Sequence, residues 1–268
     1  ANTETADEIR RFFWEHDNFD LADDQIHVFA QGMLPVLDEA GAEMHDVHGA
    51  PILAPNGHGG IYKALRDEGM FQEMEWRGIR YVVVHNVDNI LNKLADPEML
   101  GYMARQDAEL CVKVVLKEED HEGVGVLVRD NGALRVIEYS ELTDELLRRD
   151  QSGRLVHRCG HISINAFTVD FLKRLADVEL PFHEARKHIP AAVPEGQTPP
   201  VGVKRETFLF DGFAHARSFV VFPIERAVEF SPLKNGEDEP SDNVRTVKRD
   251  LYALNVRRLR EAGALVNT

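Results

Sequence analysis

The feature of this sequence that most restricts its fold is a continuous apolar run ending in polar residues, IRYVVVHNVDN at 79–89. Such a run is typical of a strand buried on both faces, and strands of that kind occur mostly in parallel sheets covered by helices. The run therefore predicts an α/β fold with a mixed, mainly parallel sheet flanked by helices. Because ligands bind beyond the carboxyl ends of such strands, Asp88 is expected near a site.

Helical and strand patterns alternate along the rest of the chain. Amphipathic periodicity predicts helices at 5–16, 61–75, 168–177, about 206–217 and from about 241 onward. Short apolar runs predict strands at 26–30, 111–117, 124–128, 133–137 and 218–224, with Asn131-Gly132 as a hairpin turn. No segment between these elements is long enough to separate independently folding parts, so one domain over 1–268 is expected.

The composition excludes several classes of partner. Among 268 residues, 31 Lys and Arg face 46 Asp and Glu, which gives a formal net charge of −15. This charge opposes broad binding to nucleic acid or anionic membranes, whereas a small anionic ligand needs only a few local donors. Two cysteines form no disulfide framework, and neither a signal peptide nor a run of about 20 apolar residues is present. A soluble, cytoplasmic protein is expected.

Several polar residues have two interpretations each when they are read from the residues alone. The glycine-rich stretch APNGHGG at 54–60 precedes a helix, so its N–H groups would hold an anion or a base edge, or it is an ordinary loop. Asp88 is a magnesium ligand or a turn cap. Lys234 meets a phosphate or is simply exposed. Glu138 and Tyr139 bind sugar hydroxyls or face water.

Seven strings together carry a resemblance to a known family. They are QGMLP (31–35), APNGHGG (54–60), RGIRYVVVHNVDNIL (77–91), ADPEMLGY (95–102), EYSEL (138–142), FLFDGF (208–213) and EFSPLKN (229–235). In this order and spacing the chain resembles the eukaryotic-type UDP-N-acetylglucosamine pyrophosphorylases, within the UDP-sugar pyrophosphorylase group. The resemblance implies a Rossmann-like nucleotidyltransferase fold of the GT-A-like kind. It also implies a reaction that joins UTP and N-acetylhexosamine 1-phosphate into a UDP-sugar and pyrophosphate, with Mg²⁺.

The resemblance also implies roles for residues in four site loops, 31–60, 85–91, 138–142 and 208–235. Gln31 matches the glutamine that reads the uracil base, and Gly57 would be a second uridine contact. Asp88 would hold the metal at the phosphates. Lys234 would offset the phosphate charge, which makes Asp88 and Lys234 the catalytic residues.

A further set of residues is implied to contact the sugar: His58, Glu138, Tyr139, His161, Phe208 and Phe210. Two of them depart from the family pattern, because His58 and His161 stand where the N-acetylglucosamine enzymes have asparagine. The G-H-G around His58 is instead similar to UDP-glucose pyrophosphorylases. The sugar is therefore expected to be N-acetylglucosamine, with glucose or another hexose as the alternative.

One signature of the family is absent from the 268 residues, the glycine-rich L-x-G-G-x-G-T-R-L-G loop with its downstream lysine. The chain is therefore expected to be a C-terminal portion that lacks the N-terminal part of the core and is inactive alone. A missing half on another chain, or a homodimer through an exposed sheet edge, would cover the apolar surface left open. Two more functional classes fit the sequence: a non-catalytic UDP-sugar-binding module, and an interaction domain that has lost its ligand.

Overall fold

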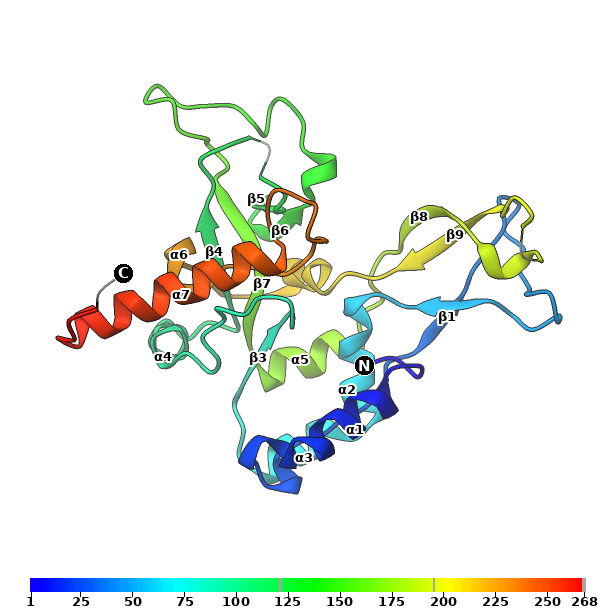
Figure 1. The fold of residues 1–268 in the computed structure, drawn as a ribbon, viewed down its shortest axis with the longest axis horizontal. Helices are drawn as coiled ribbons and strands as arrows, with labels where there is room; N and C mark the ends of the chain where they lie inside the picture. Colours follow the sequence, from blue (N-terminus) through cyan, green and yellow to red (C-terminus); the bar gives the residue numbers. More distant parts are fainter. Residues whose placement is uncertain (121, 195, 267–268) are drawn as a thin grey trace. The chain divides into compact units, whose positions relative to one another are not determined.

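A computed structural model describes residues 1–120, 122–194 and 196–266, and the chain divides into two compact units. Unit 1 comprises Ala1–Ile79 and Leu172–His215, and unit 2 comprises Arg80–Phe171 and Ala216–Thr268. The path of the chain through both units can be followed in Figure 1. The expectation that 1–268 form one catalytic domain stays a prediction.

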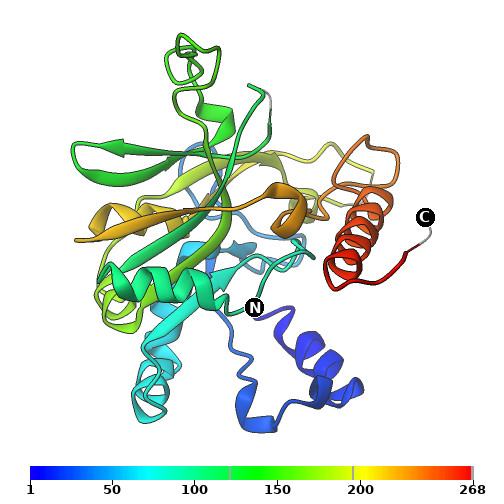
Figure 2. The ribbon, with the colours of Figure 1, turned by 90° about the vertical axis from the view of Figure 1, so that its left-hand side faces the viewer.

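Unit 2 is built on a six-stranded sheet in the order β10-β4-β7-β5-β6, with β3 also paired to β7. Its strands are β3 (Tyr81–His85), β4 (Leu110–Leu116), β5 (Val126–Asp130), β6 (Ala133–Ile137), β7 (Cys159–Thr168) and β10 (Phe219–Pro223). The ten-residue β7 pairs with β4 along one edge, and β3 and β5 also pair with it. Figure 2 shows this sheet with the β5–β6 hairpin in green and β10 in orange.

The expected α/β class is confirmed, but the expectation of a mainly parallel sheet is wrong. Within the described chain only β10 and β4 pair in parallel, whereas β7 runs antiparallel to β3, β4 and β5. An apolar run reports that both faces of a strand are covered, and it carries no information on the direction of the neighbouring strand. Even that burial belongs more fully to β4 than to the half-buried β3.

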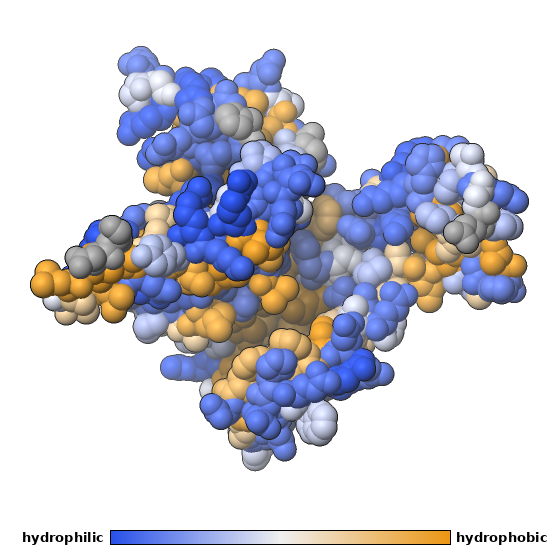
Figure 3. Space-filling model, viewed as in Figure 1, coloured by the Kyte–Doolittle hydropathy of each residue, from blue (hydrophilic) through white to orange (hydrophobic). Residues whose placement is uncertain are grey.

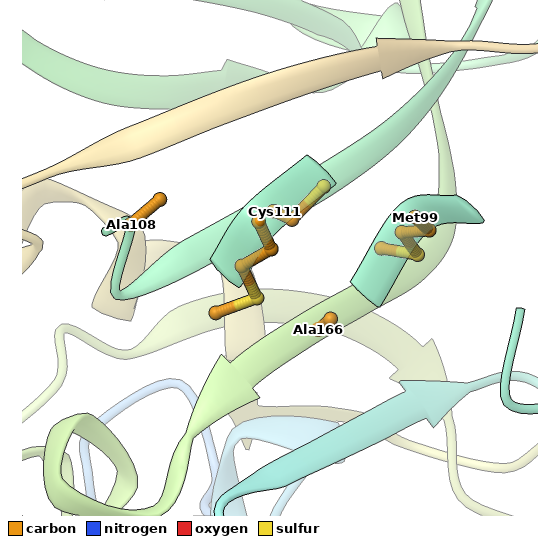
Figure 4. Packing of buried hydrophobic residues seen from close by; sticks show 5 residues of the cluster. Met99, Ala108, Cys111 and Ala166 are labelled. Atoms are coloured by element: carbon orange, nitrogen blue, oxygen red, sulfur yellow. The ribbon is translucent and has the colours of Figure 1, made fainter. Parts of the chain in front are cut away.

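Helices cover the sheet of unit 2 where apolar side chains meet. Helix α4 (Pro97–Arg105) begins with Asp96, whose side chain accepts the Glu98 N–H, and with a proline in its first turn. Its buried methionines pack with Ala108, with Cys111 of β4 and with Ala166 of β7, and Figure 4 shows this cluster. The other helical segments of the unit are η4 (Tyr139–Glu141), α6 (Arg226–Glu229), α7 (Val244–Glu261) and the first residues of α5 (Val169–Ala176).

The last helix, α7, begins with a capping box, and only part of its surface is buried. Asn243 and Thr246 exchange side-chain-to-backbone hydrogen bonds, which satisfy N–H groups of the first turn. The helix buries Val247, Leu254 and Val256. Apolar surface remains along its length in Figure 3.

Unit 1 consists of short helices and two two-stranded sheets. Its elements are α1 (Ala6–Glu15), η1 (Asp17–Asp20), η2 (Asp23–Gln25), β1 (Met33–Pro35), β2 (Leu53–Pro55), η3 (His58–Gly60), α2 (Ile61–Asp67), α3 (Met70–Trp76), β8 (His183–His188), η5 (Pro190–Ala192), β9 (Val201–Glu206) and η6 (Leu209–His215). The β1–β2 and β8–β9 pairs are both antiparallel and lie near each other (Figure 1). Val36, Ala54 and Ile189 form the buried cluster beneath them.

Three predicted elements of unit 1 differ from the structure. The predicted strand at 26–30 is wrong, because this segment pairs with no strand and its Val28 carbonyl accepts from the Arg10 guanidinium instead. The predicted helix at 61–75 is two helices, because Gly69 turns the backbone to φ +71° between them. The predicted helix at about 206–217 is the 3-10 helix η6, which begins after β9 has ended at Glu206.

Most other element predictions are confirmed. Helices α1 and α5 and strands β4, β5, β6 and β10 lie within a few residues of the predicted ranges. Asn131 and Gly132 adopt φ values of 47° and 88° between β5 and β6, the conformation that a two-residue hairpin turn requires. Among the helices of the described chain, none has both the length and the apolar character needed to span a bilayer.

A buried lysine ties three elements of unit 2 together. Lys113 of β4 is fully buried, and its Nζ lies 2.7 Å from Asp96 Oδ2 and within hydrogen-bonding distance of Glu229 Oε2. Lys93 Nζ lies 2.9 Å from the other oxygen of Asp96. Burial by itself raises the pKa of Asp96, but hydrogen bonds from Lys113 and Lys93 outweigh burial and hold the pKa below its ordinary value.

Replacement of this lysine is expected to destabilise the fold strongly. Lys113→Met leaves the Asp96 and Glu229 carboxylates buried without their shared cation, which costs about 3–5 kcal/mol in systems of this kind. Urea unfolding measures the change in the free energy of unfolding. Lys248→Met, at an exposed position of α7, is the control and changes it by less than about 0.5 kcal/mol. Equal stabilities for the two variants would contradict the role of Lys113.

Candidate functional site

The glycine-rich loop of unit 1 is held against the segment that follows β9. The Thr207 N–H donates to the Asn56 carbonyl and the Gly59 N–H donates to the Thr207 carbonyl, each over 2.8 Å. The Leu209 N–H donates to His58 Nδ1, also over 2.8 Å. Segments 151 residues apart in the sequence therefore form one close contact.

This contact explains why the loop contains glycine at position 57. Gly57 adopts φ +79°, and a Cβ atom there would lie 2.4 Å from the Thr207 carbonyl oxygen. A Cβ atom at Gly59 would lie 2.8 Å from Thr207 Oγ1. The Thr207 carbonyl oxygen lies within 2.9 Å of both Cβ positions, so the chain's own backbone forbids a side chain at both without any nucleotide.

The two predicted uridine contacts meet directly. Gln31 Nε2 donates a hydrogen bond of 2.9 Å to the Gly57 carbonyl oxygen. This bond fixes the Gln31 side chain beside the loop, although the two residues are 26 positions apart. Sequence spacing could not reveal this contact, because it depends on the path of the chain between β1 and β2.

Three of the predicted sugar contacts form an aromatic cluster in the same unit. The ring centroids of His58, Phe208 and Phe210 lie 5.1–5.7 Å apart pairwise. Sequence reasoning missed His183, whose ring stacks on Phe208 at 4.2 Å and whose Nε2 lies 2.8 Å from Asp211 Oδ2. The position of Asp211 inside FLFDGF was the one available signal.

The hydrogen bond from Leu209 fixes the state of the His58 ring. Because Nδ1 accepts from a backbone N–H, the neutral ring carries its proton on Nε2 and offers a donor there. Desolvation by the surrounding chain lowers the pKa of His58, and His183 adds to this effect while Asp211 opposes it. His58 is an exposed residue.

A cavity of about 220 Å³ lies beside the glycine-rich loop in unit 1. Its walls are Leu34, Asn56, Gly59, Gly60, Tyr62, Lys63, Leu175, Val178, Glu179, Leu180, Phe182 and Thr207. None of the predicted uridine or sugar contacts lines it. The cavity therefore adjoins the loop backbone without containing the side chains that the sequence singled out.

In unit 2 the structure brings together the two residues expected at the phosphates. Lys234 Nζ lies 4.0 Å from Asp88 Oδ2, and the side chains are 48% and 24% exposed. The Leu233 N–H donates to the Asp88 carbonyl oxygen over 2.9 Å, which joins the two loops through the backbone. The carboxylate and the ammonium thus face solvent as a pair.

The remaining predicted sugar contacts of unit 2 have different environments. Glu138 follows β6, and its Oε1 lies 3.4 Å from the position of a Cβ atom on Gly125. His161 of β7 is 7% exposed, donates its backbone N–H to the Gly125 carbonyl and lies 3.1 Å from Asn165 through Nε2. Tyr139 is 58% exposed. Sequence reasoning missed Gly125, which lies between Glu138 and His161.

The predicted site residues thus fall into two sets. Unit 1 contains Gln31, Gly57, His58, Phe208 and Phe210, and unit 2 contains Asp88, Glu138, Tyr139, His161 and Lys234. Each set has direct internal contacts. That both sets serve one nucleotide stays a prediction.

Comparison with known proteins shows the family to which this chain belongs. The model of the UTP–glucose-1-phosphate uridylyltransferase family matches residues 2–264. The chain belongs to this family. It is 39% identical to UDP-N-acetylhexosamine pyrophosphorylase-like protein 1 of Xenopus tropicalis, over 97% of the chain and 52% of that relative. It is 38% identical to the UDP-N-acetylglucosamine pyrophosphorylase of Saccharomyces cerevisiae, over 95% of the chain and 56% of that relative.

The fold agrees with that of a solved uridylyltransferase-family structure. A protein of Entamoeba histolytica that is assigned as a UDP-N-acetylglucosamine pyrophosphorylase superposes with a TM-score of 0.93 and is 46% identical. The match covers all of this chain and 68% of that one. The resemblance to UDP-sugar pyrophosphorylases and the nucleotidyltransferase-type fold are confirmed. The chain spans about half the length of the curated relatives it matches.

Replacement of Gly57 tests the backbone contact that shapes the glycine-rich loop at 54–60. Gly57→Ala must accept both the positive φ and the clash with the Thr207 carbonyl. Gly41→Ala is the matched control, because Gly41 has φ +87° and nothing within 4 Å of its Cβ position. We expect Gly57→Ala to lower the free energy of unfolding by about 1–3 kcal/mol more than the control does. Equal losses in urea unfolding would contradict the close contact.

A titration tests the environment of His58. NMR of labelled histidines is expected to give His58 a pKa below the ordinary 6.5, and Asp211→Asn is expected to lower it further because that carboxylate raises it. A lowered pKa means that the folded chain favours the neutral ring. The stability from the Leu209 contact is then complete above pH 6.5 and declines as the pH falls below it. A pKa of 6.5 or higher in the wild type would contradict this account.

Proposed function

We propose that this chain forms part of a uridylyltransferase that makes UDP-N-acetylglucosamine and pyrophosphate from UTP and N-acetylglucosamine 1-phosphate. An oxygen of the sugar phosphate attacks the α-phosphorus of UTP and forms the new P–O bond. The bond from the α-phosphorus to the oxygen bridging to the β-phosphorus breaks, and its electron pair leaves with pyrophosphate. No protein nucleophile takes part, so the protein contributes binding, alignment and charge.

The observation that carries this proposal is that two pairs of predicted site residues already lie next to each other in this chain, which belongs to the family. Gln31 is hydrogen-bonded to Gly57, and Lys234 lies 4.0 Å from Asp88. Each pair joins residues of types that suit one part of a nucleotide.

Gln31 and Gly57 would bind the base. The amide of Gln31 is oriented through its Nε2, so its oxygen can accept the N3–H of uracil. The Gly57 backbone, which has no side chain to intervene, would lie against the edge or face of the ring. An amide held in place before binding loses less rotamer freedom when the nucleotide arrives.

Asp88 and Lys234 would act on the phosphates. In the described part of the chain, no three metal-ligating side chains cluster, and Asp88 provides a single exposed carboxylate at this place. This donor set fits Mg²⁺, which takes one or two carboxylates and fills its other positions with phosphate oxygens and water. When bound, Mg²⁺ supplies positive charge to the phosphates, and Asp88 would be its protein ligand. Lys234 would neutralise phosphate oxygens with its ammonium group.

The sugar would meet His58, the two phenylalanines Phe208 and Phe210, and the unit 2 residues Glu138, Tyr139 and His161. The rings give an apolar wall, and His58 Nε2–H donates to an acceptor on the sugar. The opposite preference, for UDP-glucose, would follow if that donor serves a hydroxyl instead of an acetamido oxygen. Catalysis would also need the family's L-x-G-G-x-G-T-R-L-G signature loop, which residues 1–268 do not contain and which the same or another polypeptide would supply.

Pyrophosphate release by the natural protein tests the proposed reaction. With UTP, Mg²⁺ and N-acetylglucosamine 1-phosphate, we expect turnover that falls by about 100-fold in Asp88→Asn, since the carboxylate that would hold Mg²⁺ at the phosphates is lost. Asp144→Asn, an exposed carboxylate of the same unit, is the control and keeps wild-type rates. Tight UDP-sugar binding without any pyrophosphate release would favour the non-catalytic binding module instead.

A panel of sugars tests the role of His58. Binding or turnover is compared for the N-acetylglucosamine, N-acetylgalactosamine and glucose derivatives in the wild type and in His58→Asn. Because asparagine both donates and accepts while the neutral His58 offers one donor, the substitution is expected to change the ratio of N-acetylglucosamine to glucose. The same ratio in both proteins would remove His58 from the sugar site.

A further inference from the structure

The side chain next to Asp88 is buried and fully engaged. Asn89 is 6% exposed. Its Nδ2 donates to the Glu229 carbonyl oxygen over 2.8 Å, and its Oδ1 accepts the Ser231 N–H over 2.9 Å. Both the nitrogen and the oxygen of the Asn89 side-chain amide are therefore bonded to the backbone of a segment 140 residues away along the chain.

The segment bound by Asn89 leads directly to Lys234. Asn89 and Pro232 form an antiparallel bridge, and the Leu233 N–H donates to the Asp88 carbonyl over 2.9 Å. These two backbone contacts align residues 232–233 with residues 88–89 and so place Lys234 next to Asp88. The positions of the Asp88 and Lys234 side chains therefore depend on this short stretch of backbone pairing.

The same segment is anchored on its far side to the body of unit 2. The Glu229 carboxylate contacts the buried Lys113, which in turn lies 2.7 Å from Asp96. Ser231 Oγ donates to Asp250 Oδ2 of α7 over 2.9 Å. Asn89 thus attaches the loop that carries Asp88 to a segment that is itself fixed to β4, α4 and α7.

The side chains that precede Asn89 in the chain, Val87 and Asp88, add little to hold this loop in place. Val87 is 95% exposed, so it packs against almost nothing. The Asp88 carboxylate and the Lys234 ammonium are partly exposed and 4.0 Å apart, and a solvent-exposed pair at that distance is too weak to fix two loops. The buried Asn89 side chain, together with the backbone bond from Leu233 to Asp88, therefore restrains this pair.

We propose that Asn89 is a positioning residue that sets the spacing of Asp88 and Lys234 for a metal-bound nucleoside diphosphate. This inference rests on the proposed function, in which that pair meets the phosphates and the cation. A ligand that draws Asp88 to the metal and Lys234 to phosphate gains affinity when the two loops are already ordered. Asn89 does not touch the ligand and acts through its neighbour.

The test uses Mn²⁺ and UDP as the probe, with Mn²⁺ binding followed by electron paramagnetic resonance. Asn89→Ala removes both hydrogen bonds, and Asn89→Asp keeps the shape and the acceptor but loses the donor to Glu229. We expect Asn89→Ala to weaken Mn²⁺–UDP binding by about 10-fold or more, and to speed amide exchange at Leu233 because its bond to Asp88 loosens. Asn255→Ala, at an exposed asparagine of α7 outside the four site loops, should leave both measurements unchanged.

A double variant separates positioning from a general structural effect. If Asn89 acts through Asp88, the pair Asp88→Ala and Asn89→Ala binds Mn²⁺–UDP no more weakly than Asp88→Ala alone. Additive losses would overturn the inference, and so would wild-type binding by Asn89→Ala when Asp88→Ala binds weakly. If Asp88→Ala binds as the wild type does, or if the wild type binds no Mn²⁺–UDP, the proposed role of Asp88 itself fails and the inference falls with it.

Discussion

The structure of the candidate site depends on a backbone contact that tolerates no side chain. The glycine-rich loop and the segment after β9 approach until a Cβ atom on Gly57 would lie 2.4 Å from the Thr207 carbonyl. That approach brings the Leu209 N–H to His58 Nδ1, and it presents the Gly57 carbonyl to Gln31. The hydrogen bonds are individually modest, but their geometry is available only to glycine at this position.

In unit 2 the predicted site residues are also fixed in position, but there buried polar groups set the geometry instead of glycines without side chains. The Asn89 amide and the cation of Lys113 bind backbone and carboxylates in places from which water is excluded. Buried polar groups are costly when they are left unpaired, so each one specifies its partners strongly. These buried groups hold the loops that carry Asp88 and Lys234, because an ion pair in contact with solvent is too weak to fix two loops by itself.

The sequence was sufficient for the family, the fold class and most strands and helices, because apolar periodicity and short motifs encode local structure. It was insufficient for strand direction, since the half-buried strand β3 within the run at 79–89 pairs antiparallel with β7. The pairing of Gln31 with Gly57, and of Lys234 with Asp88, follows from chain paths that no local pattern records. Asn89 was hidden for the same reason, because its two partners lie 140 and 142 residues away.

The central claim is that the Gln31–Gly57 contact of unit 1 and the Asp88–Lys234 pair of unit 2 each bind a UDP-sugar, as the proposed function requires. Hydrogen–deuterium exchange of the chain with and without UDP-N-acetylglucosamine and Mg²⁺ tests it most directly, because each unit reports separately. The account predicts slower exchange both at 56–60 and at 86–92 with 231–235, at one common ligand concentration. Protection confined to one of the two units, at a concentration that saturates it, would contradict the claim.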